Sequence, residues 1–396
     1  MKPLLSLAEA QARTLALATP LPRRDVPLAH AAGRWLAGPG AATVDHPFAD
    51  LSAMDGYAIR FDDLPGPWTV TAEVAAGTMP ARAVGPGEAA RIFTGAPVPP
   101  GADTILIQEE AARDGGTLHL SGEGPPARGA HIRRQGEGFR TGDTVLETGA
   151  KLTPAAIGLA AMAGHATLPV HETPRIALLS TGDELAPPGT ALKPGQIYNS
   201  NGPMLAALLS AEPVTFVTSP PLPDRLDALR ATIRDAAATS DILVLTGGAS
   251  VGDHDLVRPA LEAEGAAIDF WRVAMKPGKP LMAGRLRDCV VLGLPGNPVS
   301  AFVTAILFLK PLIAALGGAA DPLPRTVSIP LAAPLPANGA RLEFLRAALA
   351  GGAVRALQGQ ESHALQVLAA ADALILRPPH APAADVGMFA DVLILS

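Results

Sequence analysis

Four glycine-containing segments in the second half of the chain carry residue types that suit the binding of phosphate and of a metal ion. Each follows a short apolar run typical of a buried strand, and three lead towards a helix. They are residues 180–184, 246–255, 275–280 and 293–300. Glycines let backbone N–H groups approach an anion closely, and a helix N-terminus adds a favourable dipole. Because ligands bind at the carboxyl ends of strands in such sheets, the segments are predicted to surround one pocket.

The predicted pocket contains charges of both signs. Lys276 and Lys279 flank a Pro-Gly turn, so both ammonium groups are expected to face the same place and to bind phosphate or another oxyanion. Glu184 and Asp255 are carboxylates in neighbouring segments. Carboxylates repel phosphate unless a cation such as Mg²⁺ lies between them. The combination predicts metal-assisted phosphoryl or adenylyl chemistry. Glu184 and Asp255 are the candidate metal ligands, and Asp253 is a third carboxylate in these segments, so the sequence leaves open which of them holds the ion.

Each segment taken singly has an ordinary structural explanation. A glycine pair after a strand is commonly a turn, Lys-Pro-Gly-Lys is commonly a surface turn, and Asp255 could cap a helix. It is the set of four that favours a functional site. The sequence has no G-x-G-x-x-G, Walker A or His-Glu-x-x-His motif, which disfavours dinucleotide-binding, P-loop and zincin proteins.

The elements that must position these segments alternate along the chain. Apolar strands are expected at 176–179, 214–217, 242–245 and 289–292, and helices at 204–209, 226–237, 256–263 and 299–316. Strands that are apolar throughout belong to a mostly parallel sheet covered on both faces. Residues 175–320 are therefore predicted to form a doubly wound α/β domain.

The N-terminal part is predicted to be helical with an insertion. Ser6 and Glu9 have capping-box spacing, a short helix is expected at 28–36, and Thr153-Pro154 is a favourable start for a third helix. Between them lie short β-like runs separated by Gly and Pro. We expect a helical region in two pieces, 1–45 and 139–174, and an inserted β domain over 46–138.

The C-terminal part is again β-like. Candidate strands lie at 326–329, 342–349, 365–368 and 392–395, separated by turns. They predict a small C-terminal β-barrel over residues 321–396. The chain as a whole is thus expected to be a multidomain α/β plus β protein.

Composition further restricts the class of protein and the partners that it can bind. A chain of 396 residues is too long to fold around one hydrophobic core, so several domains are expected. Its composition, 48% hydrophobic and 17% charged residues, excludes a disordered protein. A formal net charge of −6 argues against a nucleic-acid partner. The single Cys289 cannot build a disulfide framework. We found neither a signal-peptide pattern nor an unbroken membrane-spanning run, so no membrane partner and a cytoplasmic location are expected.

Six segments resemble, in order along essentially the whole chain, the signatures of the molybdopterin molybdenumtransferase family. Besides the four above they are Ser-Ala-Met-Asp-Gly-Tyr-Ala at 52–58 and Arg-Ile-Phe-Thr-Gly-Ala-Pro at 91–97. The resemblance implies an elongated helical region with an inserted β domain, a molybdopterin-binding α/β domain and a C-terminal β-barrel. It also implies a homodimer whose active-site cleft lies between the α/β domain of one subunit and the inserted domain of the other.

The resemblance also implies a set of cleft residues. Those with catalytic roles are Asp55, Thr94, Glu184, Asp224, Asp255, Arg272 and Lys276. Those in contact with substrate are Gly247, Gly248, Ser250, Lys279, Pro295, Pro298 and Ser300. Three positions depart from the common pattern. Arg272 replaces a frequent Lys, whereas Gly138 and Asn199 each replace a frequent Asp.

The implied activity is the insertion of molybdenum, supplied as molybdate, into adenylylated molybdopterin, with Mg²⁺ as cofactor and release of AMP. Other molybdenum cofactor biosynthesis proteins and acceptor proteins are candidate partners. One alternative is a molybdopterin adenylyltransferase, which would need neither the region of Asp55 nor the C-terminal barrel. Another is a peptide-binding scaffold similar to the C-terminal domain of gephyrin, which would release no AMP.

Overall fold

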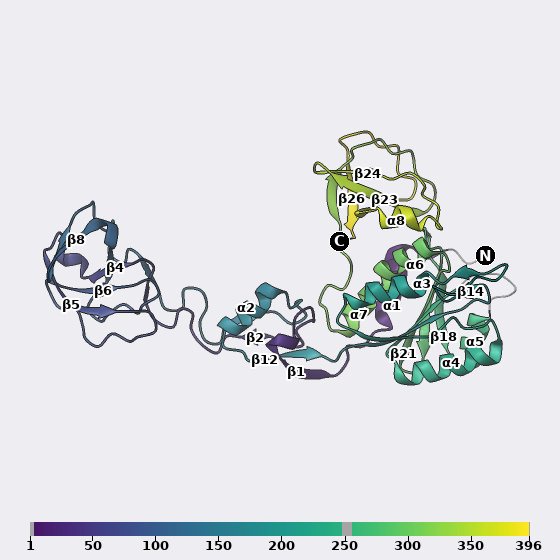
Figure 1. Ribbon diagram of the computed structural model, residues 1–396, viewed down its shortest axis with the longest axis horizontal. Coiled ribbons are helices and arrows are strands. Elements are labelled where there is room, and N and C mark those ends of the chain that lie inside the picture. The colour runs from purple at the N-terminus through teal and green to yellow at the C-terminus, as the bar shows by residue number, and fades with distance from the viewer. Residues whose placement is uncertain (1–3, 248–255, 396) are drawn as a thin grey trace.

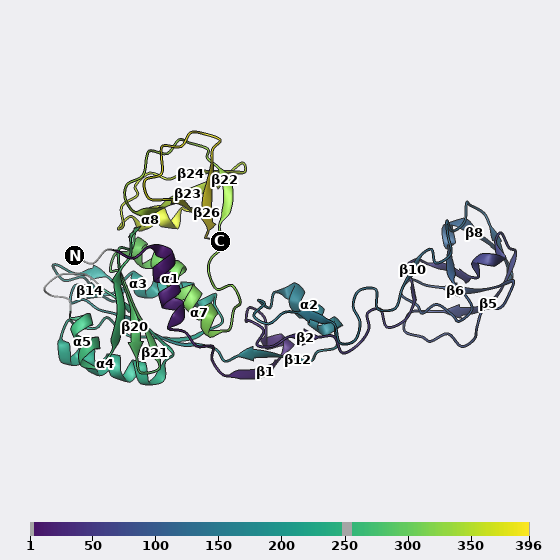
Figure 2. The same cartoon turned by 180° about the vertical axis from the view of Figure 1, so that it is seen from behind.

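The molecule is elongated and consists of three bodies along its length. The structure, a computed structural model, describes residues 4–247 and 256–395. A β-sheet body lies at one end, and a smaller central part carries β1 (Arg23–Pro27), β12 (Thr167–His171) and α2 (Pro154–Met162). An α/β domain with a second β body beside it lies at the other end (Figures 1 and 2). The predicted site residues Gly248, Ser250 and Asp255 lie outside the described residues.

The α/β domain is built on a mixed six-stranded sheet. Its strands, in spatial order, are β16 (Thr215–Thr218), β13 (Arg175–Ser180), β17 (Ile242–Thr246), β21 (Cys289–Leu294), β20 (Pro280–Leu286) and β18 (Ala267–Arg272). The first four are parallel, as their apolar sequences predicted, whereas β20 runs antiparallel to both of its neighbours. The antiparallel pair was not predicted, because an apolar run does not reveal the direction of its partner.

Helices cover both faces of this sheet. One face carries α4 (Leu226–Thr239) and α5 (Val257–Ala263), and the other carries α1 (Leu7–Ala16), α3 (Asn201–Ser210), α6 (Pro298–Thr304) and α7 (Lys310–Leu316). The small strands β14 (Leu185–Ala186) and β15 (Ile197–Tyr198) form a parallel pair beside the sheet. Helix α4 buries Leu229, Ile233 and Ala237, the predicted apolar face.

The predicted long helix at 299–316 is confirmed. Helices α6 and α7 are joined without a break by a π-helical turn, η4 (Ala305–Leu309). The turn lies just before Pro311, whose missing N–H and bulky ring interrupt ordinary α-helical bonding. The stretch Pro298–Leu316 is long and apolar enough to cross a membrane, but 83% of its most apolar 18-residue window is buried inside the fold, as in the core helix of a globular domain.

The central part is mostly strands and turns, so the prediction of a helical N-terminal region is wrong for much of its length. Strand β1 (Arg23–Pro27) pairs with β12 (Thr167–His171), and β2 (Gly40–Ala41) pairs with β11 (Thr144–Leu146). The helix expected at 28–36 is only the 3₁₀ turn η1 (Leu28–His30), because the following backbone bridges Lys151 and Val170 instead. Helix α2 (Pro154–Met162) is present with its predicted Thr153 cap.

Helix α1 belongs to the α/β domain rather than to the central part. Ser6 caps it by accepting a hydrogen bond from the Glu9 N–H at 3.2 Å. The Glu9 carboxylate binds Arg13 instead of completing a capping box. The helix packs on α7 and η4, and the Gln11 amide donates to the Leu307 carbonyl at 2.9 Å.

The β body at the far end is a mixed sheet with apolar clusters on its two faces. Its spatial order is β7 (Thr104–Ile107), β4 (Gly56–Ile59), β6 (Glu88–Ile92), β5 (Trp68–Val74), β9 (Thr117–Leu120) and β8 (Ala111–Asp114). Beside it are β3 (Leu51–Ser52) with β10 (Ile132–Arg133), and the 3₁₀ turns η2 (Phe61–Asp63) and η3 (Gln108–Glu110). We call this body the inserted sheet.

The C-terminal body is a second mixed sheet. Its order is β19 (Met275–Lys276), β23 (Leu342–Ala350), β25 (Ala373–Arg377), β26 (Phe389–Ile394) and β22 (Val327–Pro330), and β24 (Ala353–Ala356) also pairs with β23. The bridge between Leu331 and Val354 links the β22 end to β24. The strand predicted at 365–368 is wrong: it is helix α8 (Leu365–Ala369), which buries Leu368 against the α/β core.

Candidate active site

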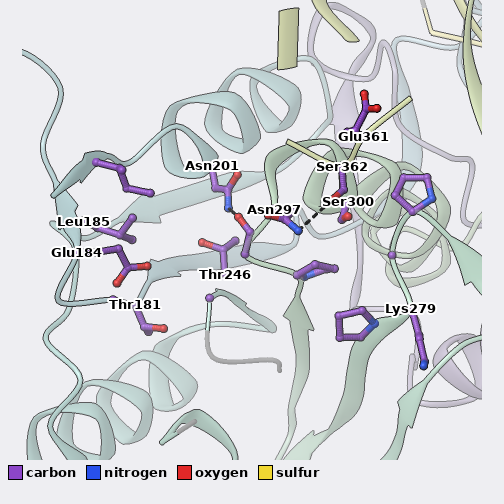
Figure 3. A pocket seen from close by; sticks show the side chains of 18 of the residues that line it. Thr181, Glu184, Leu185, Asn201, Thr246, Lys279, Asn297, Ser300, Glu361 and Ser362 are labelled. Carbon is purple, nitrogen blue, oxygen red and sulfur yellow. Dashed lines mark hydrogen bonds between the residues drawn. The ribbon is translucent and has the colours of Figure 1, made fainter. Parts of the chain in front are cut away.

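A cavity of about 760 Å³ opens where the α/β sheet meets the C-terminal body. Figure 3 shows Thr181 and Glu184 on one side of it and Lys279 on the other. The cavity is lined from the α/β domain by Thr181, Gly182, Glu184, Leu185, Ile197, Asn201, Asp224, Thr246, Gly247, Lys276, Pro277, Gly278, Lys279, Pro280, Pro295, Gly296, Asn297 and Ser300. The C-terminal body contributes Arg341, Gln360, Glu361 and Ser362.

The cavity lies at a topological switch point of the sheet. From β13 the chain crosses through α3 to β16 on one side, and then returns through α4 to β17 on the other side of β13. The segments that leave the carboxyl ends of β13 and β17 therefore diverge, and a crevice opens between them. This is the place where open α/β sheets bind ligands.

The segment after β17 approaches the segment after β13 so closely that glycine is required. Gly247 has φ +87°, and a Cβ there would lie 2.3 Å from the Thr181 carbonyl oxygen. Two polar atoms nearby, Thr181 Oγ1 and Asn201 Oδ1, are buried and have no hydrogen-bond partner among the described residues. Buried polar atoms are normally satisfied, so both are placed to bind a ligand or water. Sequence patterns did not single out either residue.

One edge of the cavity is acidic. Glu184 and Asp224 both line it, and the Asp224 N–H donates to Asp183 Oδ1 at 3.1 Å. Burial, together with the negative charges of Asp183 and Glu184, raises the pKa of the Asp224 carboxyl. A cation bound at this edge would relieve the repulsion.

The opposite edge is basic and is formed by the turn between β18 and β20. Gly278 has φ +105°, and a Cβ there would lie 2.7 Å from Thr304 Cγ2, so only glycine fits between the two lysines. Both lysine side chains are exposed. Lys276 Nζ lies 2.6 Å from Glu343 Oε1 of the C-terminal body. Both lysines line the cavity.

The C-terminal wall was missed by sequence reasoning. Asn297 Nδ2 donates to Ser362 Oγ at 3.0 Å, and the Val299 N–H donates to the Ser362 carbonyl at 3.2 Å. The buried Arg346 holds the same loop by donating to the carbonyls of Gly359 and Glu361. The run Gly-Gln-Glu-Ser at 359–362 is indistinguishable in sequence from a solvated surface loop, so no signal marked it.

Most of the described site predictions in the α/β domain converge on the cavity. Those that line it are Glu184, Asp224, Gly247, Lys276, Lys279, Pro295 and Ser300. Pro298 is the first residue of α6, and Arg272 ends β18 with its guanidinium carbon 5.9 Å from the Trp271 ring centroid. Neither lines the cavity.

The two departures at Gly138 and Asn199 have local structural roles. The Gly138 N–H donates to the His46 carbonyl at 3.0 Å, and a Cβ there would lie only 3.1 Å from the same oxygen. Asn199 is buried, and its Oδ1 accepts from the Gly202 N–H in the first turn of α3 at 3.0 Å. Neither residue lines the cavity.

Asp55 directly precedes β4 and Thr94 follows β6 of the inserted sheet. That sheet lies at the opposite end of the molecule from the α/β domain and the C-terminal body (Figure 1). Asp55 Oδ1 accepts hydrogen bonds from the Thr94 N–H at 2.7 Å and from the Thr94 hydroxyl at 2.8 Å. These two bonds hold the pKa of the Asp55 carboxyl below its usual value, and nearby Arg91 adds to the effect. The pair forms an exposed, ionised carboxylate that this chain does not bring to its own cavity.

Three family models match successive parts of the chain. "MoeA N-terminal region (domain I and II)" matches residues 5–164, "Probable molybdopterin binding domain" matches residues 177–315, and "MoeA C-terminal region (domain IV)" matches residues 328–395. The fold and the cavity therefore define a multidomain protein built around a domain of the molybdopterin-binding type.

Individual relatives agree with this class. Molybdopterin molybdenumtransferase 2 of Mycobacterium tuberculosis is 38% identical over 364 residues, which cover 88% of this chain and 89% of that protein. The molybdopterin molybdenumtransferase of Nostoc sp. is 40% identical, with 73% and 68% covered. The crystal structure of the molybdopterin biosynthesis MoeA protein from Pyrococcus horikoshii OT3 has a TM-score of 0.84 at 27% identity, with 99% and 100% covered. The chain belongs to the MoeA family of molybdopterin molybdenumtransferases.

Proposed function

We propose that this protein is a transferase that inserts molybdenum from molybdate into adenylylated molybdopterin and releases AMP. The observation that carries the proposal is the cavity at the switch point, with Lys276 and Lys279 on one edge and Glu184 and Asp224 on the other. Phosphates need the basic edge, and a dianion such as molybdate needs cationic or N–H donors as well. The relatives named molybdopterin molybdenumtransferase support the same activity.

In the proposed reaction, different residues of the cavity bind different parts of the substrates. The lysines and Gly247 bind the phosphates of adenylylated molybdopterin, and Ser300 and Pro295 shape the wall beside them. Arg341 supplies positive charge for molybdate. Thr181 Oγ1 and Asn201 Oδ1, which lack protein partners among the described residues, bind polar groups of the substrate. Water attacks the phosphoanhydride and AMP leaves. The two dithiolene sulfurs bind molybdenum, and one molybdate oxygen departs with the two thiol protons as water.

We further propose that the reaction depends on Mg²⁺ held by Glu184 and Asp255. The raised pKa of the neighbouring Asp224 supports a cation at this edge. No group of three His, Cys, Asp or Glu side chains among the described residues is arranged to hold an ion. Two carboxylates completed by phosphate oxygens and water are a usual ligand set for Mg²⁺. Bound there, Mg²⁺ would neutralise phosphate charge and polarise the bond that breaks.

Charge-removing variants test the metal site. Glu184→Gln and Asp255→Asn should reduce AMP release strongly and alter its Mg²⁺ dependence, while the melting temperature changes little. The alternative is that Asp255 caps helix α5, for which Asn would serve equally well. Wild-type rates and wild-type Mg²⁺ titration curves in both variants would reject the metal site.

We propose a homodimer in which the inserted sheet of one subunit completes the cavity of the other. Asp55 and Thr94 form a preorganised carboxylate site, yet the central part of the chain separates them from the cavity (Figures 1 and 2). A second subunit could bring an Asp55 to each cavity. Arg272, at the end of β18, and Pro298 are proposed to act at the rim of the same cleft.

The remaining expectations belong to the same proposal. The proposed domains are residues 1–45 together with 139–174, residues 46–138, residues 175–320 and residues 321–396. The proposed location is the cytoplasm. Gly248 and Ser250 are proposed to contact substrate from the loop after β17. Other cofactor biosynthesis proteins and acceptor proteins are the proposed partners.

Cofactor reconstitution tests the activity directly. Purified protein, adenylylated molybdopterin, molybdate and Mg²⁺ should yield AMP and a cofactor that activates a molybdoenzyme lacking it. A molybdopterin adenylyltransferase would instead consume ATP and molybdopterin. A scaffold would produce neither AMP nor active cofactor, and this result would reject the proposed function.

A further inference from the structure

A salt bridge joins the lysine turn of the cavity to the C-terminal body. Lys276 Nζ lies 2.6 Å from Glu343 Oε1. The backbone brings the two residues together, because β19 pairs with β23 in parallel and places Lys276 opposite Glu343. The Leu342 N–H also donates to the Ala274 carbonyl at 3.1 Å. Strand β23 therefore determines where the Lys276 ammonium group lies.

Stability alone does not account for this pair. The Lys276 side chain is 50% exposed and that of Glu343 is 17% exposed. Ion pairs with this much exposure contribute little to folding, because water screens them. A lysine side chain has high rotamer freedom, however, and a bound ligand must restrict it. A carboxylate that already restricts the side chain lowers that cost before substrate arrives.

We propose that Glu343 is a positioning residue for Lys276, holding its ammonium group at the cavity wall where it meets anionic substrate. Glu343 does not itself line the cavity, so it acts through Lys276. This inference rests on the proposed function of the cavity and extends it. The C-terminal body then contributes to substrate binding by orienting a residue of the α/β domain.

A double-mutant cycle tests whether Glu343 acts through Lys276. The variants are Lys276→Ala, Glu343→Ala and the double substitution, and the measurements are kcat/KM for AMP release and the Kd for AMP by calorimetry. Each single substitution should lower kcat/KM about tenfold and raise the Kd for AMP about tenfold, which is the effect of losing one charged hydrogen bond. The double variant should be no worse than Lys276→Ala, because the two effects share one group. Glu343→Gln, whose amide oxygen still accepts from Nζ, should recover most of the loss.

A matched ion pair elsewhere provides the control. Lys310 Nζ lies 2.7 Å from Glu212 Oε1 with similar exposure, and neither residue lines the cavity. Glu212→Ala should leave kcat/KM and AMP affinity unchanged. If Glu343→Ala causes a further loss in the Lys276→Ala background, or if Glu343→Gln is as weak as Glu343→Ala, the positioning role is overturned. Absence of AMP release by the wild type would reject the proposed function, whereas the AMP-binding cycle would still decide the role of Glu343.

Discussion

At the scale of single residues, two of the predicted site carboxylates, Asp224 in the cavity and Asp55 in the inserted sheet, have pKa values shifted in opposite directions. Asp224 has a raised pKa, first because of burial and then because of Asp183 and Glu184. Asp55 has a lowered pKa because Thr94 donates two hydrogen bonds to it. One carboxylate is thus strained when ionised and the other is stabilised when ionised. The contributions of the two carboxyl groups to the stability of the fold should therefore change with pH in opposite directions.

Asp224→Asn should stabilise the protein at neutral pH and reduce AMP release. A carboxyl group whose folded pKa is raised contributes stability below its unfolded pKa and loses that contribution as pH rises through the folded pKa. The variant should therefore melt higher than the wild type near pH 7, and the difference should close below about pH 4. Calorimetric melts over this range measure it. The exposed Asp235 provides a control, since Asp235→Asn should change neither melting nor rate.

Thr94→Val should raise the pKa of Asp55 towards its ordinary value without abolishing the shift. The variant loses the hydroxyl donor and keeps the backbone N–H, the larger cause of the shift. A depressed carboxyl pKa contributes stability above the unfolded pKa and loses it as pH falls through the folded pKa, so any effect is confined to acid pH. An NMR titration of the Asp55 carboxyl carbon measures the change. Thr94→Ser keeps the donor and should match the wild type; an unchanged pKa in Thr94→Val would contradict the assigned cause.

At the scale of elements, the cavity depends on close packing between the segments that leave β13 and β17. The Thr181 N–H donates to the Thr246 carbonyl at 2.9 Å, and Gly247 follows in a conformation with positive φ. The two strands pair in parallel up to Ser180 and Thr246. The crevice therefore begins at the last paired residues of the sheet.

Gly247→Ala should destabilise the protein and weaken AMP binding. Positive φ costs a non-glycine residue about 1–3 kcal/mol, and the added Cβ would also press on the Thr181 carbonyl at 2.3 Å. Gly189 provides a matched control, because it has φ +86° and nothing within 4 Å of an added Cβ. Urea unfolding should show a larger loss for Gly247→Ala than for Gly189→Ala. Equal losses would mean that the contact with Thr181 does not matter.

At the scale of the whole molecule, the elongated shape separates two groups of site residues. The cavity lies between the α/β domain and the C-terminal body, whereas Asp55 and Thr94 lie in the inserted sheet at the far end (Figure 2). The central part between them is thin and is held by short strand pairs such as β1 with β12. The homodimer proposed above would bring Asp55 of a second subunit to each cavity.

Subunit mixing should reveal the shared cavity. In the proposed homodimer, a heterodimer of Asp55→Asn and Glu184→Ala subunits would contain one doubly substituted cavity and one unsubstituted cavity, so it should recover about half of the wild-type AMP release. A heterodimer of Asp55→Asn and Thr94→Ala subunits is the control, since every cavity then carries a substitution. No recovery in a demonstrated Asp55→Asn/Glu184→Ala heterodimer would place the whole site within one subunit.

Several elements could be predicted from local sequence because their determinants are local. Each of these features is set by residues close together in the sequence. They are the apolar runs of β13, β17 and β21, the amphipathic face of α4 and the Thr153 cap of α2. Loops after such strands share one edge of a parallel sheet, so the convergence of Glu184, Gly247 and Ser300 also followed. The MoeA family could be recognised for a related reason, since its six motifs are short and contiguous.

Tertiary structure alone decided the remaining features, because they depend on partners distant in the chain. Residues 34–36 extend instead of continuing a helix, since their backbone pairs with Lys151 and Val170. Residues 365–369 become helical where Leu368 meets the α/β core. The C-terminal wall with Arg341 and Ser362, and the Lys276–Glu343 pair, arise only when two domains meet. The sequence by itself determined the apolar strands β13, β17 and β21 of the α/β domain and the glycine-containing turns that follow them. Which segments pair or pack with one another was decided by burial and hydrogen bonding between parts of the chain that are distant in sequence, and local residue patterns do not specify these contacts.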